Sequence, residues 1–396
     1  MDLLSAKANS TPQQFAHLLI EKGPIFWAEI EKFWVVTDMD LAQSILKGVD
    51  FSADRSAFFM SRMSGCPFHK VANFFSVVKK MMVTSDPPEH TARRKLGLAG
   101  INDHIIDDFA PAVCKVVDQV LAGIKPGRID FVQDIALPLP NIILAEMFSV
   151  PQAARPDFYR WSNHMTQFFG GASADIHSDA ANADTGAANL REYFQEMIQQ
   201  RRRQPQNDFI SHLVKNQGGL DDSEVISQAA IMLVAGTVTT TDQICNNLNV
   251  LLHSGIWAKL VAQPALLEAA IEEATRLDPS VNFIFRVAAR DLTLGGKSIQ
   301  AGQLVFISTH ATNRNAVTFS RPDNFSLDRT RNPHLAYGAG IHHCLGARLG
   351  RIQMRALFAS LLETYPDLSV DADHPPVRKH QSLAFSGFET FPVRIK

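Results

Sequence analysis

Cys344 lies in the stretch of the chain whose residue types most clearly suggest chemistry, "HLAYGAGIHHCLG" at positions 334–346. A helical pattern of apolar residues follows at about 345–364, which predicts that the sulfur lies at a helix N-terminus. The helix dipole and the unpaired N–H groups there favour the thiolate, the form that binds metals. Gly338 and Gly340 allow the preceding loop to adopt backbone conformations closed to other residues and to approach a flat ligand closely.

The residues alone leave two other interpretations of Cys344 open. One is a buried free cysteine beside a glycine turn, which is the ordinary state of an isolated cysteine. The other is a zinc site formed with His342 and His343. Adjacent residues rarely bind one ion together, and no second pair of ligands lies at the usual spacing, so the zinc site is the weaker of the two.

The segment "YGAGIHHCLG" closely resembles the haem-binding signature of the cytochrome P-450 superfamily: aromatic, Gly, any, Gly, any, His, any, Cys, any, Gly. Tyr337 stands where phenylalanine is commonest in that family, and the aromatic ring is retained. The resemblance implies that Cys344 is the axial thiolate of haem b (iron protoporphyrin IX) and that the N–H groups of the loop tune its electron donation. It also implies that His342 faces a haem propionate.

Two further stretches match the family in the expected order. His90 and Arg94 in "DPPEHTARRKL" (86–96) are one helical turn apart, so both can face one anionic group. The resemblance assigns this pair, together with Arg286 of "FRVAARD" (285–291), to the haem propionates. Taken singly, each of these residues is equally consistent with a surface charge.

Glu273 and Arg276 in "EEATR" (272–276) are spaced so that their side chains meet on one helix face. Most such pairs are solvated surface contacts. The resemblance implies instead a buried ionic cluster in which Arg329 of "PDNFSLDR" joins the pair and stabilises the core around the haem loop.

A long helix is predicted over 221–255, with Asp221 as its cap and Glu224 three residues later. It runs for about thirty residues, or roughly 45 Å. In its middle, "AGTVTT" (235–240) resembles the family segment in which a local helix distortion makes room for dioxygen. The resemblance assigns Gly236 to that distortion and Thr239, followed by Thr240, to the hydroxyl groups of the catalytic site.

Val238 departs from the family pattern, because it occupies the place of an Asp or Glu that usually relays protons. A valine side chain can neither donate nor accept a proton. One interpretation is tolerated variation, in which solvent, Thr237, Thr240 or the substrate carries the relay. The other is slower, substrate-assisted or diverted oxygen chemistry.

The substrate pocket is predicted from the apolar residues that fall in the family's variable pocket segments. They are Phe58, Phe59, Phe74, Phe75, Phe168, Phe169, Leu233, Val234, Phe283 and Phe285. Their concentration suggests a small apolar substrate, such as a terpenoid, a fatty acyl chain, a polyketide or an aromatic compound, free or bound to a carrier. The stretch 170–189, rich in glycine and alanine, is predicted to be a mobile connection beside this pocket.

The resemblance implies separate electron donors, a ferredoxin and its reductase, because the chain carries no flavin or iron–sulfur module. Arg348, Arg351 and Arg355 recur near one face of the helix after Cys344. With Arg93 or Lys95 they are predicted to form a basic patch for an acidic donor, although a solvated helix face would look the same.

The pattern of elements predicts a mainly α protein with a minor β portion. A hairpin is predicted over 25–37, a short helix over 40–48, helices over most of 90–277, short strands over 285–308 and a last helix over 345–364. The strands lie near both ends of the chain, so a single domain over 1–396 is predicted. The resemblance implies the triangular, mostly helical fold of the family.

Composition limits the partners. The chain has 396 residues, 46% of them hydrophobic, and a formal net charge of -2, which favours a globular protein and argues against binding to nucleic acids. No basic start followed by an apolar run is present at the N-terminus, so no signal peptide or membrane anchor is expected. The four cysteines are widely separated, which favours reduced thiols in a cytoplasm, and a monomer is expected.

The sequence is thus identified as a member of the cytochrome P-450 superfamily, of the soluble bacterial type. The resemblance implies a monooxygenase that oxidises a small apolar substrate with dioxygen and ferredoxin electrons in specialised metabolism. A peroxide-using enzyme, an oxidative coupling catalyst and a non-catalytic haem protein that binds a ligand remain as alternatives, and Val238 is the feature that suggests them.

Overall fold

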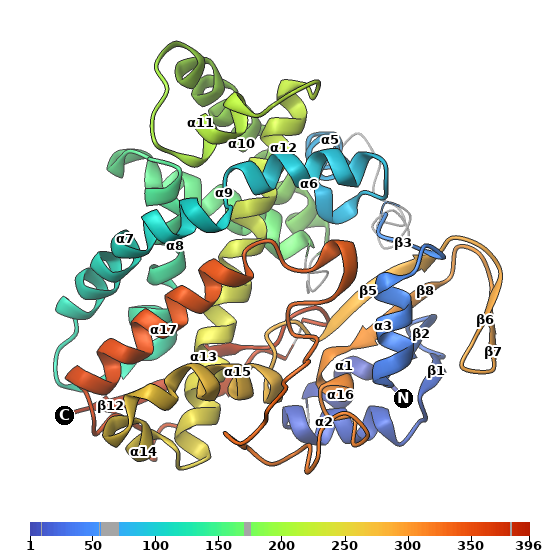
Figure 1. Ribbon diagram of the computed structural model, residues 1–396, viewed down its shortest axis with the longest axis vertical. Helices are drawn as coiled ribbons and strands as arrows, with labels where there is room; N and C mark the ends of the chain where they lie inside the picture. Colours follow the sequence, from blue (N-terminus) through green and yellow to red (C-terminus); the bar gives the residue numbers. More distant parts are fainter. Residues whose placement is uncertain (9, 55, 57–70, 170–175, 381) are drawn as a thin grey trace. The chain divides into compact units, whose positions relative to one another are not determined.

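The computed structural model describes the chain except residues 9, 55, 57–70, 170–175 and 381, and its elements form two compact units (Figure 1). The first unit comprises Met1–Phe51, Ala112–Pro140 and Thr239–Lys396, and the second comprises Ser52–Pro111 and Asn141–Val238. Each unit is described below by itself. The predicted fold class, mainly α with a minor β portion, is confirmed. The single domain over 1–396 stays a prediction.

The first unit carries nearly all of the strands. Its helices are α1 (Leu3–Ala8), α2 (Pro12–Ile20), α3 (Met39–Lys47), α13 (Val238–His253, of which the first residue belongs to the second unit), α14 (Trp257–Ala262), α15 (Leu267–Leu277), α16 (Thr309–Thr312) and α17 (Ala347–Thr364), with short turns η3 (Val132–Ala136), η5 (Pro264–Leu266) and η6 (Gly340–His342). Its strands are β1 (Ile25–Ala28), β2 (Phe33–Val36), β4 (Gly127–Asp130), β5 (Phe283–Ala288), β6 (Leu292–Leu294), β7 (Lys297–Ile299), β8 (Leu304–Ser308), β9 (Ser369–Val370), β10 (Val377–Arg378), β11 (Phe388–Thr390) and β12 (Pro392–Ile395).

The second unit is helical. Its elements are α5 (Ala72–Val78), η2 (Met82–Thr84), α6 (Glu89–Ala99), η4 (Gln152–Ala154), α9 (Arg155–Phe169), α10 (Ile176–Arg203), α11 (Phe209–Lys215) and α12 (Asp222–Gly236). The chain passes between the units within β3 (Phe51–Ser52), α7 (Asp103–Ala122), α8 (Pro138–Met147) and the start of α13.

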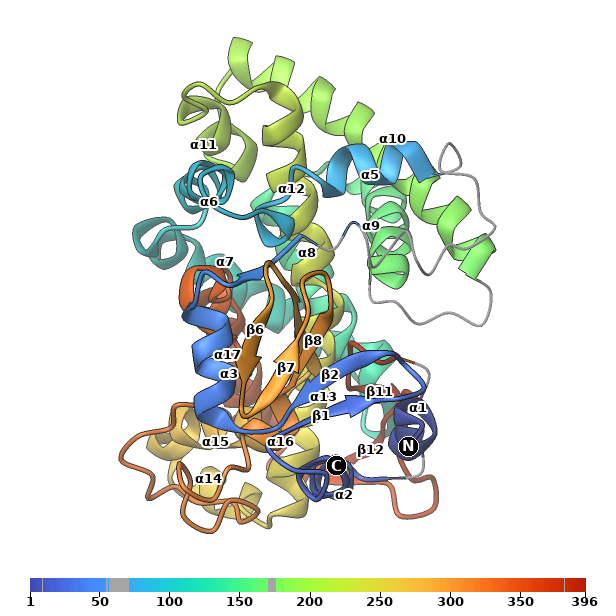
Figure 2. The same ribbon diagram turned by 90° about the vertical axis from the view of Figure 1, so that its right-hand side faces the viewer.

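A mixed sheet of order β1-β2-β8-β5-β3 organises the first unit (Figure 2). The predicted hairpin over 25–37 is confirmed as β1 and β2, and β2 then pairs in parallel with β8. One face carries aliphatic side chains such as Val36 and Ile307, which pack in one cluster with Ile45 of α3. The other face is aromatic, with the ring of Phe306 stacked between Phe33 at 3.8 Å and Phe285 at 5.0 Å.

Helix starts follow the capping signals of the sequence. Thr11 accepts a hydrogen bond from the backbone of Gln14 in a capping box that begins α2, and Asp221 does the same with Glu224 at the start of α12. Asp222–His253 is long and apolar enough by composition to cross a membrane, but 67% of its most apolar window is buried inside the protein. This burial is that of a core helix.

The predicted connection over 170–189 is wrong from residue 176 onward, because α10 begins there. Residues 170–175 lie outside the described part of the chain. Ala180, Ala183 and Ala187 are buried at helical spacing, and Gly186 lets α10 approach α9 so closely that a Cβ there would lie 2.8 Å from the Trp161 carbonyl. Alanine is the best helix former, so small residues here serve close helix packing rather than mobility.

Glu273 of α15 is the centre of a buried ionic cluster in the first unit. Its carboxylate accepts hydrogen bonds from Arg276 at 2.7 and 2.8 Å and from Arg329 at 2.9 and 3.0 Å. Glu273 and Arg276 are 1% and 0% exposed. Arg276 also donates to the carbonyls of Asn313 and Pro322, so the cluster joins α15 to the segment that follows α16.

Replacing Glu273 with alanine is expected to lower the free energy of unfolding by about 3–5 kcal/mol, because two buried guanidinium groups lose their carboxylate. Glu268→Ala is the matched control on the same helix. Glu268 pairs with Arg355, and both side chains are more than 60% exposed, so its loss is expected to cost about 0–1 kcal/mol. Urea unfolding of the two variants measures the difference, and similar losses would contradict a structural role for the cluster.

Lys7 anchors the N-terminal helix α1 to a turn near the other end of the chain. Its buried ammonium group donates to the carbonyls of Ser382 and Phe385, at 2.5 Å each. Burial lowers the pKa of Lys7 to about 7, although the negative charge of nearby Asp242 opposes the shift. Asp242 is itself fully buried and forms an ion pair with Lys379 at 2.7 Å.

The depressed pKa of Lys7 predicts how stability changes with pH. Between about pH 7 and 10.5 the unfolded chain holds a proton on Lys7 that the folded protein has released, so the free energy of unfolding rises with pH in this window. Lys7→Met removes the titrating group and is expected to flatten this rise. Urea unfolding from pH 7 to 10.5 measures it, with the exposed Lys32→Met as control. An unchanged pH dependence in Lys7→Met would show that other groups cause the rise.

Candidate active site

Cys344 lies in a short loop that precedes α17. The loop is closed by two backbone hydrogen bonds: the N–H of Cys344 donates to the Tyr337 carbonyl at 2.9 Å, and that of His343 donates to the Gly340 carbonyl at 3.1 Å. Cys344 is exposed, and it lies two residues before Gly346, the N-cap of α17. The thiol therefore lies where the helix N-terminus favours a thiolate.

Two glycines allow this loop its conformation. Gly340 has φ +69°, and a Cβ there would lie 2.2 Å from the carbonyl oxygen of Leu46 at the end of α3. Gly338 has φ +67°, and a Cβ there would lie 3.7 Å from the side chain of Ile284 in β5. The loop is thus pressed against α3 and β5, and at position 340 only glycine fits.

Arg286 lies on the same side of β5 as Ile284, because alternate residues of a strand share a face. Its side chain is 4% exposed and donates to the Phe285 carbonyl at 2.9 Å. His342 is half-buried on η6, within the Cys344 loop. The first unit therefore brings together Cys344, His342, both glycines and the strand face of Arg286.

His90 and Arg94 belong to the second unit, on the first turns of α6. His90 is 2% exposed and Arg94 is half-buried, and their spacing of one turn places both on one side of the helix. It stays a prediction that these two residues bind the haem propionates together with Arg286 while Cys344 binds the iron.

The long predicted helix is interrupted in the middle of "AGTVTT". Helix α12 ends at Gly236, Thr237 has φ -90° and ψ -77°, and α13 begins at Val238. Thr239 and Thr240 lie on the first turn of α13 and are half-buried, whereas Thr237 is buried. The segment thus contains a local distortion next to the predicted catalytic hydroxyl groups.

A model of the cytochrome P450 family matches residues 250–387. The chain is 30% identical over 375 residues to "Cytochrome P450 monooxygenase PikC" of Streptomyces venezuelae, covering 92% of this chain and 86% of that protein. It is also 28% identical over 390 residues to "Polyketide biosynthesis cytochrome P450 PksS" of Bacillus subtilis, covering 95% and 93% of the two chains.

A crystal structure of P450BioI, in complex with an acyl carrier protein that carries hexadec-9Z-enoic acid, matches the fold. Its TM-score is 0.89 at 27% sequence identity, and the match covers 100% of both chains. The protein belongs to the cytochrome P450 family. It is a P450 monooxygenase, and its cofactor is haem.

The residues of the Cys344 loop fit this cofactor. An exposed cysteine at a helix N-terminus could supply the thiolate that P450 haem iron requires. The contact between Gly340 and the Leu46 carbonyl leaves no room for a side chain on the α3 side, so the backbone itself forms that wall of the loop. Among the described residues no cluster of three or more His, Cys, Asp and Glu side chains offers a rival metal site.

The sequence analysis missed the support behind Tyr337. Arg351 of α17 lies over the Tyr337 ring at 4.2 Å and forms two hydrogen bonds with Glu272, at 2.7 and 3.0 Å. Burial opposes ionisation of Glu272, but hydrogen bonds from His334 and Arg351 outweigh it and hold its pKa at about 2. Burial likewise raises the pKa of Tyr337, which stays neutral.

Three of the residues named for the predicted basic patch have acidic partners, and the patch itself stays a prediction. Arg351 pairs with Glu272 and Arg355 with Glu268, both on α15. In the second unit Arg93 pairs with Glu224 at 3.1 Å. Arg348 and Lys95 are exposed. The sequence did not reveal the pairing because the partners are distant along the chain.

Phe74, Phe75 and Phe168 form an aromatic cluster in the second unit. The ring of Phe74 lies edge-on to Phe75 at 5.7 Å and to Phe168 at 4.9 Å. Phe58 and Phe59 lie outside the described residues, and Phe169 is the last residue of α9. Leu233 and Val234 are buried in the last turns of α12.

Phe283 and Phe285 pack within the aromatic face of the sheet in the first unit. Phe283 lies edge-on to Phe15 at 6.2 Å and to Phe306 at 5.8 Å. This packing accounts for the burial of both residues, and their contact with a substrate stays a prediction.

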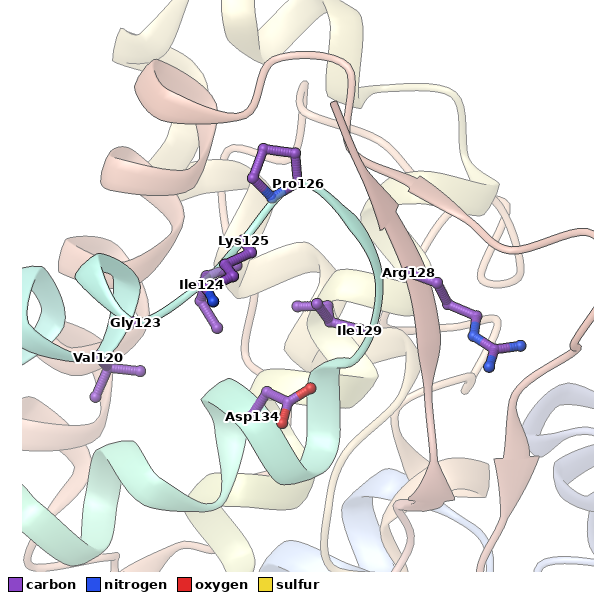
Figure 3. Close-up of a pocket in the computed structure, with 8 residues that line it drawn as sticks. All are labelled: Val120, Gly123, Ile124, Lys125, Pro126, Arg128, Ile129 and Asp134. Carbon is purple, nitrogen blue, oxygen red and sulfur yellow. The ribbon is translucent and has the colours of Figure 1, made fainter.

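One groove of about 370 Å³ lies between the end of α7, β4 and η3 (Figure 3). It is lined by Val120, Gly123, Ile124, Lys125, Pro126, Arg128, Ile129 and Asp134. None of the described residues that were predicted for the active site lines it.

Replacing Gly340 with alanine is expected to displace the Cys344 loop, because the Cβ meets the Leu46 carbonyl and the positive φ is strained, at a cost of about 1–3 kcal/mol. The variant should therefore hold less haem per protein than the parent, as measured by absorbance. Gly219→Ala, in a surface turn far along the chain from the loop, is the control, since no atom lies within 4 Å of its Cβ position. Equal haem content in the two variants would contradict this account of the loop.

Proposed function

We propose that this P450 monooxygenase oxidises a small apolar substrate, free or attached to a carrier protein, with dioxygen and electrons from a separate ferredoxin and its reductase. The observation that carries the proposal is the Cys344 loop, in which an exposed thiol, two glycines at positive φ and a helix N-terminus come together. A role in specialised metabolism is supported by the similarity to a protein named for polyketide biosynthesis.

The roles of the haem-binding residues follow from their chemistry. Cys344 binds the iron as a thiolate. Arg286 and His342 in the first unit, and His90 and Arg94 in the second, offer N–H donors to the two propionates, and charge-assisted hydrogen bonds of this kind are the strong ones. When bound, the haem supplies the activation of dioxygen and the oxidation of the substrate.

The hydroxyl groups of Thr239 and Thr240, next to the helix break, are proposed to hydrogen-bond water and to pass protons. Thr239 and Thr240 can each donate and accept a hydrogen bond, whereas Val238 between Thr237 and Thr239 can do neither. The Thr237 hydroxyl donates to the Leu233 carbonyl at 3.3 Å, and its oxygen can still accept a hydrogen bond. Proton delivery is assigned to Thr239 and Thr240 with solvent, and Gly236 provides the space at the break.

The substrate is proposed to be apolar because the aromatic cluster of Phe74, Phe75 and Phe168 offers no polar group to it. The P450BioI structure supports a carrier-bound acyl chain as one form of such a substrate. Arg348 and Lys95 are exposed, and a basic patch that includes them is proposed to attract an acidic donor. The protein is also proposed to be a monomer and to act in the cytoplasm.

Val238 is also the observation that favours a second candidate, a peroxide-using or oxidative-coupling P450 that depends less on relayed protons. The relatives are named as monooxygenases, which disfavours a non-catalytic role. Turnover with ferredoxin and reductase, compared with turnover with peroxide alone, separates the two candidates.

The proposal is tested by titrating the purified holoprotein with hexadec-9Z-enoic acid, free and attached to an acyl carrier protein, and with a steroid and a terpenoid. An apolar compound that displaces water from the iron is expected to shift the haem Soret band from low spin to high spin. The compound that does so at the lowest concentration names the substrate class.

Two cysteine variants control the titration. Cys344→Ser is expected to lose both the thiolate-type spectrum of the reduced carbon monoxide complex and the spin shift. Cys114→Ser, which changes another exposed cysteine, is expected to keep both. A thiolate-type spectrum that survives in Cys344→Ser, or a holoprotein that responds to none of the apolar compounds, would overturn the proposal.

A further inference from the structure

The break between α12 and α13 leaves backbone carbonyls that need donors. The last four carbonyls of a helix have no N–H partner on a following turn, and a buried carbonyl without a donor is unfavourable. Leu233 and Val234, near the end of α12, are 1% and 3% exposed. The Val234 carbonyl is one of these four, and because it is buried it needs a donor from the protein.

Two threonine hydroxyls serve these carbonyls. Thr237, at the break itself, donates to the Leu233 carbonyl at 3.3 Å. Thr166 of α9 donates to the Val234 carbonyl, also at 3.3 Å. The first contact is local in sequence, whereas the second joins two helices across 68 positions of the chain.

Thr166 is well placed to hold this contact. Its side chain is 1% exposed, so solvent does not compete for the hydroxyl group. The same hydroxyl lies 2.9 Å from the Ser162 carbonyl one turn earlier in α9, so its proton is shared between two acceptors. The bond to Ser162 fixes the rotamer of Thr166 and aims its hydroxyl at α12.

Helix α8 holds the break through a second contact. A Cβ on Gly236 would lie 3.1 Å from the Leu144 side chain, so the last turn of α12 is packed tightly there. The break is thus located by packing against Leu144 and by the hydrogen bond from Thr166. All of these residues belong to the second unit.

Helix α9 also carries Phe168, two positions after Thr166. Phe168 packs edge-on against Phe74 at 4.9 Å, within the aromatic cluster proposed to meet the substrate. Phe168 and Thr166 are two residues apart on one helix, so a shift of α9 at the aromatic cluster would also shift the Thr166 hydroxyl. One helix therefore joins the aromatic cluster to the break.

We propose that Thr166 is a positioning residue: its hydroxyl holds the Val234 carbonyl at the break and makes the geometry of the oxygen-activating segment depend on the position of α9. The inference rests on the proposed function for the role of that segment. The hydrogen bond itself does not depend on it.

The test compares three variants of the holoprotein. Thr166→Val replaces the hydroxyl with a methyl group of the same shape, and Thr166→Ser retains the hydroxyl. Thr185→Val is the matched control, because Thr185 is a threonine within α10 whose hydroxyl makes the local bond to the Ala181 carbonyl at 3.0 Å. If Thr166→Val does not bind haem, Thr166→Ala takes its place in the same assays.

The first readout is hydrogen–deuterium exchange of the amides over 234–240. Loss of one weak hydrogen bond is expected to change their exchange by about five-fold in Thr166→Val, while Thr166→Ser and Thr185→Val stay within about two-fold of the parent. The second readout is the peroxide released per NADH consumed with a surrogate ferredoxin and reductase. It is expected to rise in Thr166→Val and to be restored in Thr166→Ser.

Exchange over 234–240 that is unchanged in Thr166→Val, or changed equally in Thr166→Ser, would overturn the inference. So would a change spread over the whole of α9 and α10, which would indicate lost packing instead. Failure of the proposed function looks different: the parent protein would lack the thiolate-type haem spectrum, and the exchange measurement would still report on Thr166.

Discussion

The carboxylate of Glu273, buried between two arginines, determines how the first unit holds its catalytic loop. Arg276 satisfies this carboxylate and also donates to the Asn313 carbonyl. The side chain of Asn313 in turn accepts from the backbone N–H of Leu335 at 2.7 Å, just before the Cys344 loop. A buried charge without its partner is costly, so loss of the pair of Arg276 and Glu273 would weaken this chain of contacts. The position of Cys344 thus depends on a helix far from it in sequence.

Contact between backbones fixes the other side of the loop. Because Gly340 touches the Leu46 carbonyl, the haem loop and α3 are separated by no side chain. The sheet supports both, since Ile45 of α3 packs in one cluster with residues of β2 and β8. A small sheet in a mostly helical protein therefore has a defined purpose, which is to hold the end of α3 and Arg286 of β5 beside the same loop.

In the first unit, arginines that were predicted to attract an electron donor form ion pairs within the protein. Glu272 and Glu268 on α15 face Arg351 and Arg355 on α17, and Arg351 also covers the Tyr337 ring. A row of arginines after Cys344 suggested a docking surface, and two of them form ion pairs with α15, the one at Arg355 being exposed to solvent. The sequence shows that a side chain is charged, whereas the element packed against it determines which group the charge pairs with.

Local signals in the sequence were sufficient for the mainly α fold class, the hairpin at 25–37, the caps at Thr11 and Asp221, and Cys344 with its two glycines, because each depends on a few adjacent residues. Other features depended on contacts between distant segments: the helix that replaces the predicted connection after residue 176, the acidic partners of Arg351 and Arg355, and the bond from Thr166 to Val234. The sequence by itself determined the mainly α fold class and predicted which residues bind haem. Only the tertiary structure decided which groups support them, because hydrogen bonds and ion pairs form between neighbours in space.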